Sequence, residues 1–432
     1  MKNYKNLIKK FFIIIPLVVI IFISVYFYNI YKNKYLIGTI IYKDINYLEV
    51  ITENDSIYRF NYNSDFDIGD NIKIKYNKQL NDFNYIQKIN IKNIDKGNIK
   101  LDYDYKTLEI LQNMTLNEKI GQLLLVRIPE TNKIETIKKY NIGGYILFQR
   151  DIDNKTKEEL INEIKLYQST SNIPLLIAID EEGGTVSRLS SNKNIVDLPF
   201  LSPQELYKIG GFDKIKQDAI TKSNLLEELG INVNLAPIAD ISTNPKSYIY
   251  ERSFGKNKNE TAKYIKTILS TQNNNVSYVL KHFPGYSDNL DTHTSIAIDN
   301  RSYKIIKNND FIPFKVGIEN GANAIMVSHN IVSSIDNKPS SLSRNIHNIL
   351  RNELNFNGII LTDDLSMSAI KGYDTNTPYI DSILAGNNIL IVSDYISAYE
   401  EIYNAIIEDK ISEELINRLV LKNIQFKINL NL

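Results

Sequence analysis

The pattern of hydrophobic and polar positions divides the chain into three parts. Residues 11–28 form an uncharged run rich in Ile, Val and Phe, which is just long enough to cross a bilayer as a helix. Between residues 35 and 100, apolar and polar residues alternate with the two-residue period of β-strands. From residue 103 to residue 432, short apolar runs alternate with helical segments. The pattern therefore predicts a membrane anchor, a small β domain and a large α/β domain.

The charges around the apolar run predict its orientation. Four lysines lie within residues 1–10, whereas only Lys32 and Lys34 follow the run closely. The positive-inside rule then places a basic tail, residues 1–10, in the cytoplasm and the bulk of the chain outside. No small-x-small cleavage site follows the run, which favours an uncleaved anchor over residues 11–30; a cleaved signal peptide, giving a secreted form, is the alternative. We expect a single-pass protein of the cell membrane with an extracytoplasmic catalytic domain.

The alternating part contains several short predicted strands. Residues 38–42 and 72–76 alternate clearly, and turn signals occur at Asn54-Asp55 and at Gly69-Asp70. About five strands in this length predict a small antiparallel sheet or barrel, which would be a spacer or a binding module. No group of residues in it suggests catalysis.

The large part has the rhythm of repeated strand-helix units. Thr115 and Glu118 have the spacing of a helix capping box, which predicts the first helix of this large part. Helices are expected at residues 155–168, 213–229, 260–272 and 344–354. Eight such units predict a (β/α)8 TIM-type barrel, with a doubly wound sheet as the alternative. The eight apolar runs are residues 122–128, 144–148, 175–180, 233–237, 279–283, 324–329, 359–364 and 389–394.

Several of these runs end in a polar group, namely Asp180, His282, His329, Asp363 and Asp394. Active sites of (β/α)8 barrels form at the carboxyl ends of the strands. These residues are therefore the first candidates for a functional site.

Two of the four histidines fall in one short segment. Lys281 and His282 leave a predicted strand where a Pro-Gly turn stops it, and Asp291 and His293 follow. In an Asp-x-His pair the carboxylate can orient the imidazole and tune its proton affinity. The alternative for Lys281 and His282 is a surface pair or a buried structural histidine.

Carboxylates end two other strands. Asp363 and Asp364 follow a very apolar run, and because adjacent strand residues point to opposite sides, only one is expected to face the barrel axis; the alternative is that both cap the next helix. Asp180 precedes Glu-Glu-Gly-Gly, in which the glycines let the backbone approach a ligand. Arg252 could bind carbonyl or hydroxyl oxygens, or could form a surface ion pair with Glu251 or another neighbour.

Composition excludes several classes of protein. With 432 residues, 43% of them hydrophobic, the chain can bury a large core. Lys+Arg and Asp+Glu are both 50, so bulk charge gives no reason to expect a nucleic-acid partner. The absence of cysteine excludes disulfides, thiolate metal sites and a cysteine nucleophile.

Taken together, these motifs resemble the family 3 glycoside hydrolases, most closely the single-barrel β-N-acetylglucosaminidases. The resemblance runs from about Thr115 to the C-terminus and implies that residues 103–432 are a barrel of that family's N-terminal type. It identifies Asp363 as the nucleophile and the Asp291-Thr292-His293 segment as the acid/base dyad. It further implies that the sugar pocket is formed by Asp180, Arg188, Arg252, Lys281, His282, His329 and Met367.

The chemistry that this resemblance implies is retaining hydrolysis without metal or cofactor. Asp363 would attack the anomeric carbon, while His293, kept basic by Asp291, would protonate the leaving oxygen and then activate water. The expected enzyme is an exo-acting β-N-acetylhexosaminidase that removes terminal N-acetylglucosamine from β-linked glycans, such as cell-wall fragments in peptidoglycan turnover. The alternatives are a β-glucosidase, a phosphorolytic family 3 enzyme and an inactive glycan-binding scaffold.

Three positions depart from the family pattern. Tyr286 replaces the histidine of Pro-Gly-His, Thr185 stands in place of the usual arginine, and Glu181 stands where glutamine is common. The loop to Asp291 is also about one residue short. We expect these changes to affect substrate detail more than the reaction class, with Glu181 adding a negative charge near the pocket that disfavours anionic aglycones.

Overall fold

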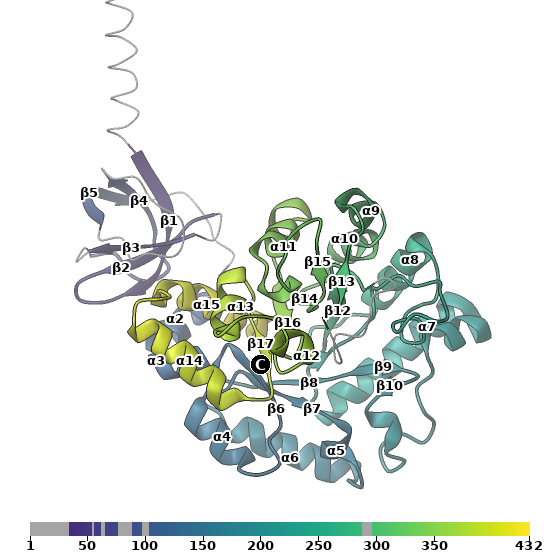
Figure 1. The fold of residues 1–432 in the computed structure, drawn as a ribbon. Helices are drawn as coiled ribbons and strands as arrows, with labels where there is room; N and C mark the ends of the chain where they lie inside the picture. The colour runs from purple at the N-terminus through teal and green to yellow at the C-terminus, as the bar shows by residue number, and fades with distance from the viewer. Residues whose placement is uncertain (1–33, 54–55, 62–64, 77–88, 97–102, 287–295) are drawn as a thin grey trace, which may run out of the picture. The chain divides into compact units, whose positions relative to one another are not determined.

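The computed structural model describes residues 34–53, 56–61, 65–76, 89–96, 103–286 and 296–432 (Figure 1). The described residues contain no helix with the length and hydrophobicity of a membrane span, and the predicted anchor at residues 11–30 lies outside them. The chain forms two compact units. The first comprises residues 1–113 and 412–418, and the second comprises residues 114–411 and 419–432.

The first unit contains a closed five-stranded barrel. Its strands run in the order β1-β2-β3-β5-β4, all neighbours being antiparallel except β3 and β5. This order is that of the OB-fold, a Greek-key barrel. The elements are β1 (Lys34–Lys43), β2 (Leu48–Ile51), β3 (Ile57–Asn61), β4 (Asn71–Tyr76), β5 (Ile89–Lys96) and helix α2 (Tyr105–Asn113).

Alternation explains the core of this barrel. Ile40, Val50, Phe60 and Ile74 all point inward and are completely buried. A Cβ at Gly38 would lie 2.3 Å from the carbonyl oxygen of Ile51, so only glycine allows the two strands to approach so closely. Of the two arrangements expected from the sequence, an open sheet or a barrel, the chain adopts the barrel.

The second unit is built on eight parallel strands, and the predicted (β/α)8 architecture is confirmed. The strands pair in the order β16-β14-β12-β11-β8-β7-β6-β17. The ring closes where the amide of Thr362 donates to the carbonyl of Ile389 at 3.1 Å. The strands are β6 (Leu124–Arg127), β7 (Gly144–Leu147), β8 (Leu176–Ile179), β11 (Val233–Asn234), β12 (Ser277–Phe283), β14 (Ala324–Val327), β16 (Ile359–Thr362) and β17 (Leu390–Val392).

Helices surround these strands (Figure 1). Thr115, Thr156 and Ser202 each form a capping box that begins a helix. The helices are α3 (Leu116–Gly121), α4 (Lys133–Tyr140), α5 (Gln149–Ile152), α6 (Lys157–Thr170), α7 (Pro203–Leu229), α8 (Lys258–Leu269), α9 (Tyr303–Asn308), α10 (Phe311–Glu319), α11 (Arg344–Asn348), α12 (Ser368–Lys371), α13 (Pro378–Ala385), α14 (Tyr395–Ile407) and α15 (Glu413–Asn429).

The helices expected from the sequence are present with shifted ends. The segment expected at residues 213–229 is the second part of α7, which is kinked at Gly210 and Gly211. The segment expected at residues 344–354 is α11 followed by a π-helical turn, Ile349–Glu353.

Two apolar layers hold the strands in place. Inside the ring, side chains such as Leu125, Ala178, Val279 and Leu361 form one buried cluster. A second cluster, with Phe283 among its members, packs helices against the outside. The strand backbone is therefore fixed on both sides, which positions the residues that follow each strand.

Candidate active site

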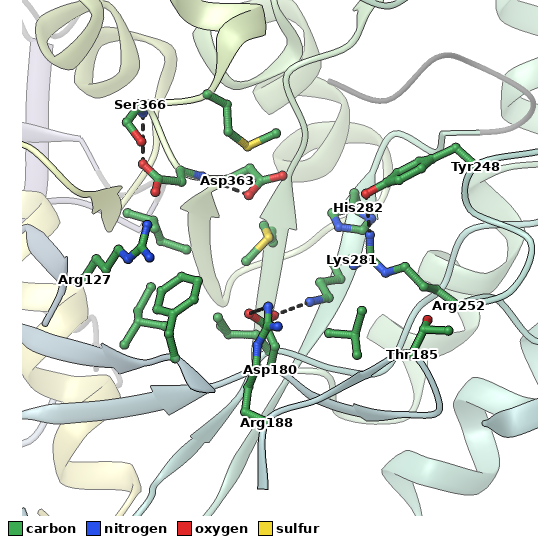
Figure 2. Close-up of a pocket in the computed structure, with 18 of the residues that line it drawn as sticks. Arg127, Asp180, Thr185, Arg188, Tyr248, Arg252, Lys281, His282, Asp363 and Ser366 are labelled. Atoms are coloured by element: carbon green, nitrogen blue, oxygen red, sulfur yellow. Dashed lines mark hydrogen bonds and ion pairs between the residues drawn. The ribbon is translucent and has the colours of Figure 1, made fainter. Parts of the chain in front are cut away.

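A cavity of about 650 Å³ lies at the carboxyl ends of the barrel strands (Figure 2). Polar groups from at least four strand ends meet in it, as expected for a (β/α)8 barrel. Of the residues predicted from the sequence, those that line this cavity are Asp180, Arg188, Arg252, Lys281, His282, Asp363 and Met367.

Asp363 and Asp364 both line the cavity, and the expectation that only one of them faces the barrel axis stays a prediction. Strand β16 ends at Thr362, and the alternation of a strand no longer applies beyond it. The two carboxylates nevertheless differ. Asp364 accepts hydrogen bonds from the amide of Ser366 at 2.9 Å and from the hydroxyl of Ser393 at 2.8 Å. Asp363 accepts one from the amide of Asp364 at 2.8 Å.

Opposite these carboxylates lies a buried ion network. Lys281 Nζ lies 2.6 Å from Asp180 Oδ1 and 2.7 Å from Glu182 Oε1, and only 2% of its side chain is exposed. Arg252 binds Glu182 through two hydrogen bonds, Nη2 to Oε1 at 2.8 Å and Nε to Oε2 at 3.0 Å. Arg252 is therefore not a surface partner of Glu251. The network holds Lys281 and Arg252 in fixed positions at the cavity wall.

The charges in this network explain its protonation. Burial by itself would raise the pKa of Glu182, but the adjacent Arg252 and Lys281 outweigh burial and lower that pKa to about 2. Burial would lower the pKa of Lys281, whereas Asp180 and Glu182 raise it. Glu182 and Lys281 are thus both charged at neutral pH, and Lys281 acts only as a hydrogen-bond donor.

A second buried carboxylate orients His282. Asp240 is 1% exposed, and its Oδ2 accepts hydrogen bonds from the His282 amide at 3.0 Å and from the Nδ1 side of the ring at 2.8 Å. Its Oδ1 accepts the amide of Tyr286 at 2.7 Å. With Nδ1 engaged as a donor, Nε2 is the ring nitrogen that can accept a hydrogen bond from a ligand.

Tyr286 supports His282 from behind. Its ring is 1% exposed and meets the imidazole edge-on, with centroids 5.0 Å apart. It also packs in a small buried cluster with Ile238 and Ile249. The tyrosine that departs from the family pattern therefore packs against His282 and is not itself among the residues that line the cavity.

Comparison with known proteins agrees with this arrangement. A family model described as "Glycosyl hydrolase family 3 N terminal domain" matches residues 115–424. The chain belongs to glycoside hydrolase family 3. A β-hexosaminidase of Nitrosomonas eutropha is 32% identical to this glycoside hydrolase over 298 residues, covering 65% of this chain and 83% of the relative. A β-hexosaminidase of Xylella fastidiosa is 25% identical over 260 residues, covering 58% of this chain and 76% of that relative.

A solved structure has the same fold. The family 3 β-N-acetylglucosaminidase from a Paenibacillus strain superposes on this glycoside hydrolase with a TM-score of 0.67 and 27% sequence identity. The match covers 74% of this chain and 63% of that one, so this chain spans less than two thirds of the Paenibacillus protein.

One predicted site residue of this family 3 glycoside hydrolase, His329, is placed differently from those that line the cavity. His329 is completely buried and is not among the residues that line the cavity. Its Nδ1 lies 2.7 Å from the Ser341 hydroxyl, and its Nε2 lies 2.9 Å from the carbonyl of Asp364. We therefore correct its predicted role from pocket wall to support of the carboxylate loop. Asp291 and His293 lie outside the described residues.

Glu181 also departs from its expected role. It is 1% exposed, does not line the cavity, and accepts hydrogen bonds from the Ser187 hydroxyl and from the amide of Leu189. Burial raises the pKa of Glu181 to about 7, although these hydrogen bonds oppose the shift. Because Glu181 binds both neighbours of Arg188, it fixes the loop that carries this arginine and does not present its charge to the pocket.

Sequence reasoning missed Glu182, Asp240 and Arg127. Glu182 and Asp240 touch residues that line the cavity, and Arg127 lines it directly. One signal was available for Asp240 and Arg127, since each follows an apolar strand run just as the recognised residues do. Nothing in the sequence marks Glu182 as the partner of two cations that lie 70 or more positions away.

We expect Glu182→Gln to weaken both activity and stability. The change leaves two buried cations without their shared anion, and displacement of Lys281 and Arg252 should lower kcat/KM by about 10²-fold. Breaking a buried pair in this way costs about 3 kcal/mol of the free energy of unfolding. Glu181→Gln is the matched control, because this neighbouring buried glutamate contacts neither cation; it should change kcat/KM far less.

The stability difference should depend on pH. The pKa of Glu182 is lowered in the folded state from 4.5 to about 2, so its stabilising effect is complete above about pH 5 and is lost as the pH falls through 2. Thermal unfolding of wild type and Glu182→Gln should therefore differ most above pH 5 and converge toward pH 2. A difference that is constant across this range would show that Glu182 does not act through its charge.

Proposed function

We propose that this chain is an exo-acting, retaining β-N-acetylhexosaminidase that removes terminal N-acetylglucosamine from β-linked glycans. The observation that carries the proposal is that Asp363 shares one cavity with Asp180, Lys281 and His282. This arrangement supports Asp363 as a carboxylate nucleophile that faces a rigid set of hydroxyl-binding groups. The relatives named β-hexosaminidase and β-N-acetylglucosaminidase support the choice of sugar.

The pocket geometry suits a terminal sugar. Lys281 donates from a buried position, Asp180 accepts, and His282 offers Nε2, so a sugar can be held by groups that cost little to order. Glu182 and Asp240 fix Lys281 and His282, so a sugar bound by these two residues would present its anomeric carbon to Asp363 in one orientation. Two residues of the wall, Met326 and Met367, add apolar contact area.

The proposed reaction has two steps. Asp363 attacks the anomeric carbon while His293 gives a proton to the departing glycosidic oxygen, forming a glycosyl-enzyme ester and releasing the aglycone alcohol. His293 then takes a proton from water, which attacks the same carbon and frees Asp363. Asp364 is held by Ser366 and Ser393 and keeps the loop in position.

A panel of aryl β-glycosides tests the proposal directly. The full-length protein should hydrolyse the 2-acetamido-glucoside with a higher kcat/KM than the glucoside, and should release the β-anomer first, as retention requires. Preference for the glucoside would make the enzyme a β-glucosidase, and stimulation of turnover by inorganic phosphate would make it a phosphorylase. If none of the glycosides is hydrolysed, the proposal of an enzyme fails and the alternative of an inactive glycan-binding scaffold is favoured.

We also propose that the enzyme is tethered to the cell membrane with the barrel outside, as the apolar run at residues 11–28 and its preceding lysines indicate. Protease added to intact cells with an accessible outer face should digest the barrel, and the intact protein should fractionate with membrane. Protection of the full-length protein would contradict this orientation, and recovery of a shortened protein in the medium would show cleavage.

A further inference from the structure

Arg127 ends the first barrel strand and has no anionic partner among the residues that the structure describes. Its Nε is buried without a hydrogen-bond partner, and the structure shows no ion pair between its guanidinium and any acidic residue that it describes. The guanidinium stacks on the ring of Phe148, whose centroid lies 4.3 Å from Cζ. Stacking on an aromatic face fixes the plane of the guanidinium while leaving its edge able to donate hydrogen bonds.

The other cations of the site differ in this respect. Lys281 pairs with Asp180 and Glu182, and Arg252 pairs with Glu182. Arg188 shares the ring of Phe148 at 5.5 Å and its Nε also lacks a hydrogen-bond partner among the described residues, but its guanidinium lies 3.5 Å from Asp180. In Figure 2, Arg127 lies on the side of Ser366, across the cavity from Lys281 and Arg252. A partly buried charge without a protein partner is costly unless a ligand supplies the opposite charge.

A second cavity adjoins the first at this point. It has a volume of about 710 Å³, and both Arg127 and Ser366 line the two cavities. Its other lining residues include Lys371, Tyr379, Asp394 and Tyr395. The volume is in the range of ligand sites, and aromatic rings beside polar groups are typical of them.

The charges of this second cavity favour an anion. Arg127 and Lys371 are its cations, and Asp394 is the one carboxylate among its described lining residues. The Oδ1 of Asp394 accepts the amide of Ser397 at 3.1 Å as the N-cap of α14, and its single charge is outnumbered by those of Arg127 and Lys371. Arg127, by contrast, can offer a planar pair of donors to a carboxylate, sulfate or phosphate.

We propose that Arg127 and the second cavity form a subsite for a negatively charged substituent of the substrate. This inference rests on the proposed function, since the substituent would be carried by a glycan whose terminal sugar occupies the first cavity. The anionic group could belong to that terminal sugar or to the leaving group. Glu181, the carboxylate expected from the sequence to repel such groups, lies outside the cavity lining.

Two pairs of substrates separate these sources. The first pair is the 4-methylumbelliferyl 2-acetamido-glucoside with and without a 6-sulfate, which places the charge on the terminal sugar. The second is 2-acetamido-glucose β-linked to glucuronic acid or to glucose, which places the charge on the leaving group. The quantity measured is the ratio of kcat/KM for the charged member to that for the neutral member, at low salt.

Wild type should prefer the charged member of one pair. In that pair, Arg127→Gln should lower the ratio of kcat/KM for the charged member to that for the neutral member by about 10- to 100-fold, the usual range for a hydrogen bond to a charged group. Arg127→Lys keeps the charge but loses the fork of donors and should give an intermediate ratio. Arg344→Gln, which removes an exposed arginine that lines neither cavity, is the control and should leave the ratio unchanged.

The inference fails if wild type and Arg127→Gln show equal ratios in both pairs while the neutral substrates are hydrolysed. It also fails if Arg344→Gln lowers the ratio as much as Arg127→Gln does, because the effect would then not depend on the position of the arginine. If wild type hydrolyses neither neutral substrate, the proposed function is what fails, and this inference fails with it.

Discussion

The Asp363→Asn variant is expected to fold normally and to lose nearly all hydrolysis, by about 10⁴-fold or more in kcat, because removal of a covalent nucleophile has effects of this size. The side chain is on the surface of the cavity and Asn keeps its shape, so the hydrogen bond from the Asp364 amide can persist. Circular dichroism and thermal unfolding should therefore match wild type.

Asp364→Asn is the matched control for this result. Its carboxylate also lines the cavity but holds Ser366 and Ser393, so we expect a smaller loss of activity together with lower thermal stability. A slow 2-fluoro glycosyl substrate should label wild type at Asp363, as judged by peptide mass spectrometry. Labelling of Asp364 would show that the nucleophile has been assigned to the wrong carboxylate.

Removal of His293 should have the next largest effect, and the loss should depend on the leaving group. A sugar alcohol leaves poorly without a proton, so His293→Ala should cost about 10²–10⁴-fold on natural glycans, the usual range for general acid catalysis. Dinitrophenolate departs almost without protonation, so the step in which a dinitrophenyl glycoside glycosylates the enzyme should be nearly unaffected by His293→Ala. Asp291→Ala should show the same pattern more mildly, because it removes only the partner that orients the imidazole.

Measuring kcat/KM against pH distinguishes proton transfer from positioning. The limb of the profile that reports the general acid should disappear in His293→Ala. Asp240→Asn provides a comparison, because Asp240 orients a different histidine, His282, at the sugar-binding side of the cavity. Asp240→Asn should lower kcat/KM by a similar factor for natural glycans and for dinitrophenyl glycosides. Equal losses on both substrates in His293→Ala, with the limb intact, would mean that another residue carries the proton.

Much of the barrel could be predicted because its signals are local. Each strand is a short apolar run that is buried on both faces, and the polar residues that end the runs at Asp180, His282 and Asp363 do meet in one cavity. His329 also ends a run, yet it is absent from the cavity lining, since Ser341 and the carbonyl of Asp364 engage both of its ring nitrogens. The position after a strand thus indicates the end of the barrel at which a residue lies, and packing decides whether it faces the substrate.

By itself the sequence determined the eight strand-helix units, the family and the carboxylate nucleophile candidate, because hydrophobic period and motif spacing are properties of neighbouring residues. The tertiary structure alone decided the partners. Glu182 joins Arg252 and Lys281 across 70 and 99 positions of the chain, and Asp240 reaches His282 across 42. Arg127 lines a second cavity, and the structure shows no ion pair between it and any acidic residue that it describes. Such pairings depend on which strand ends become neighbours when the ring closes, and burial then makes each charge require a partner.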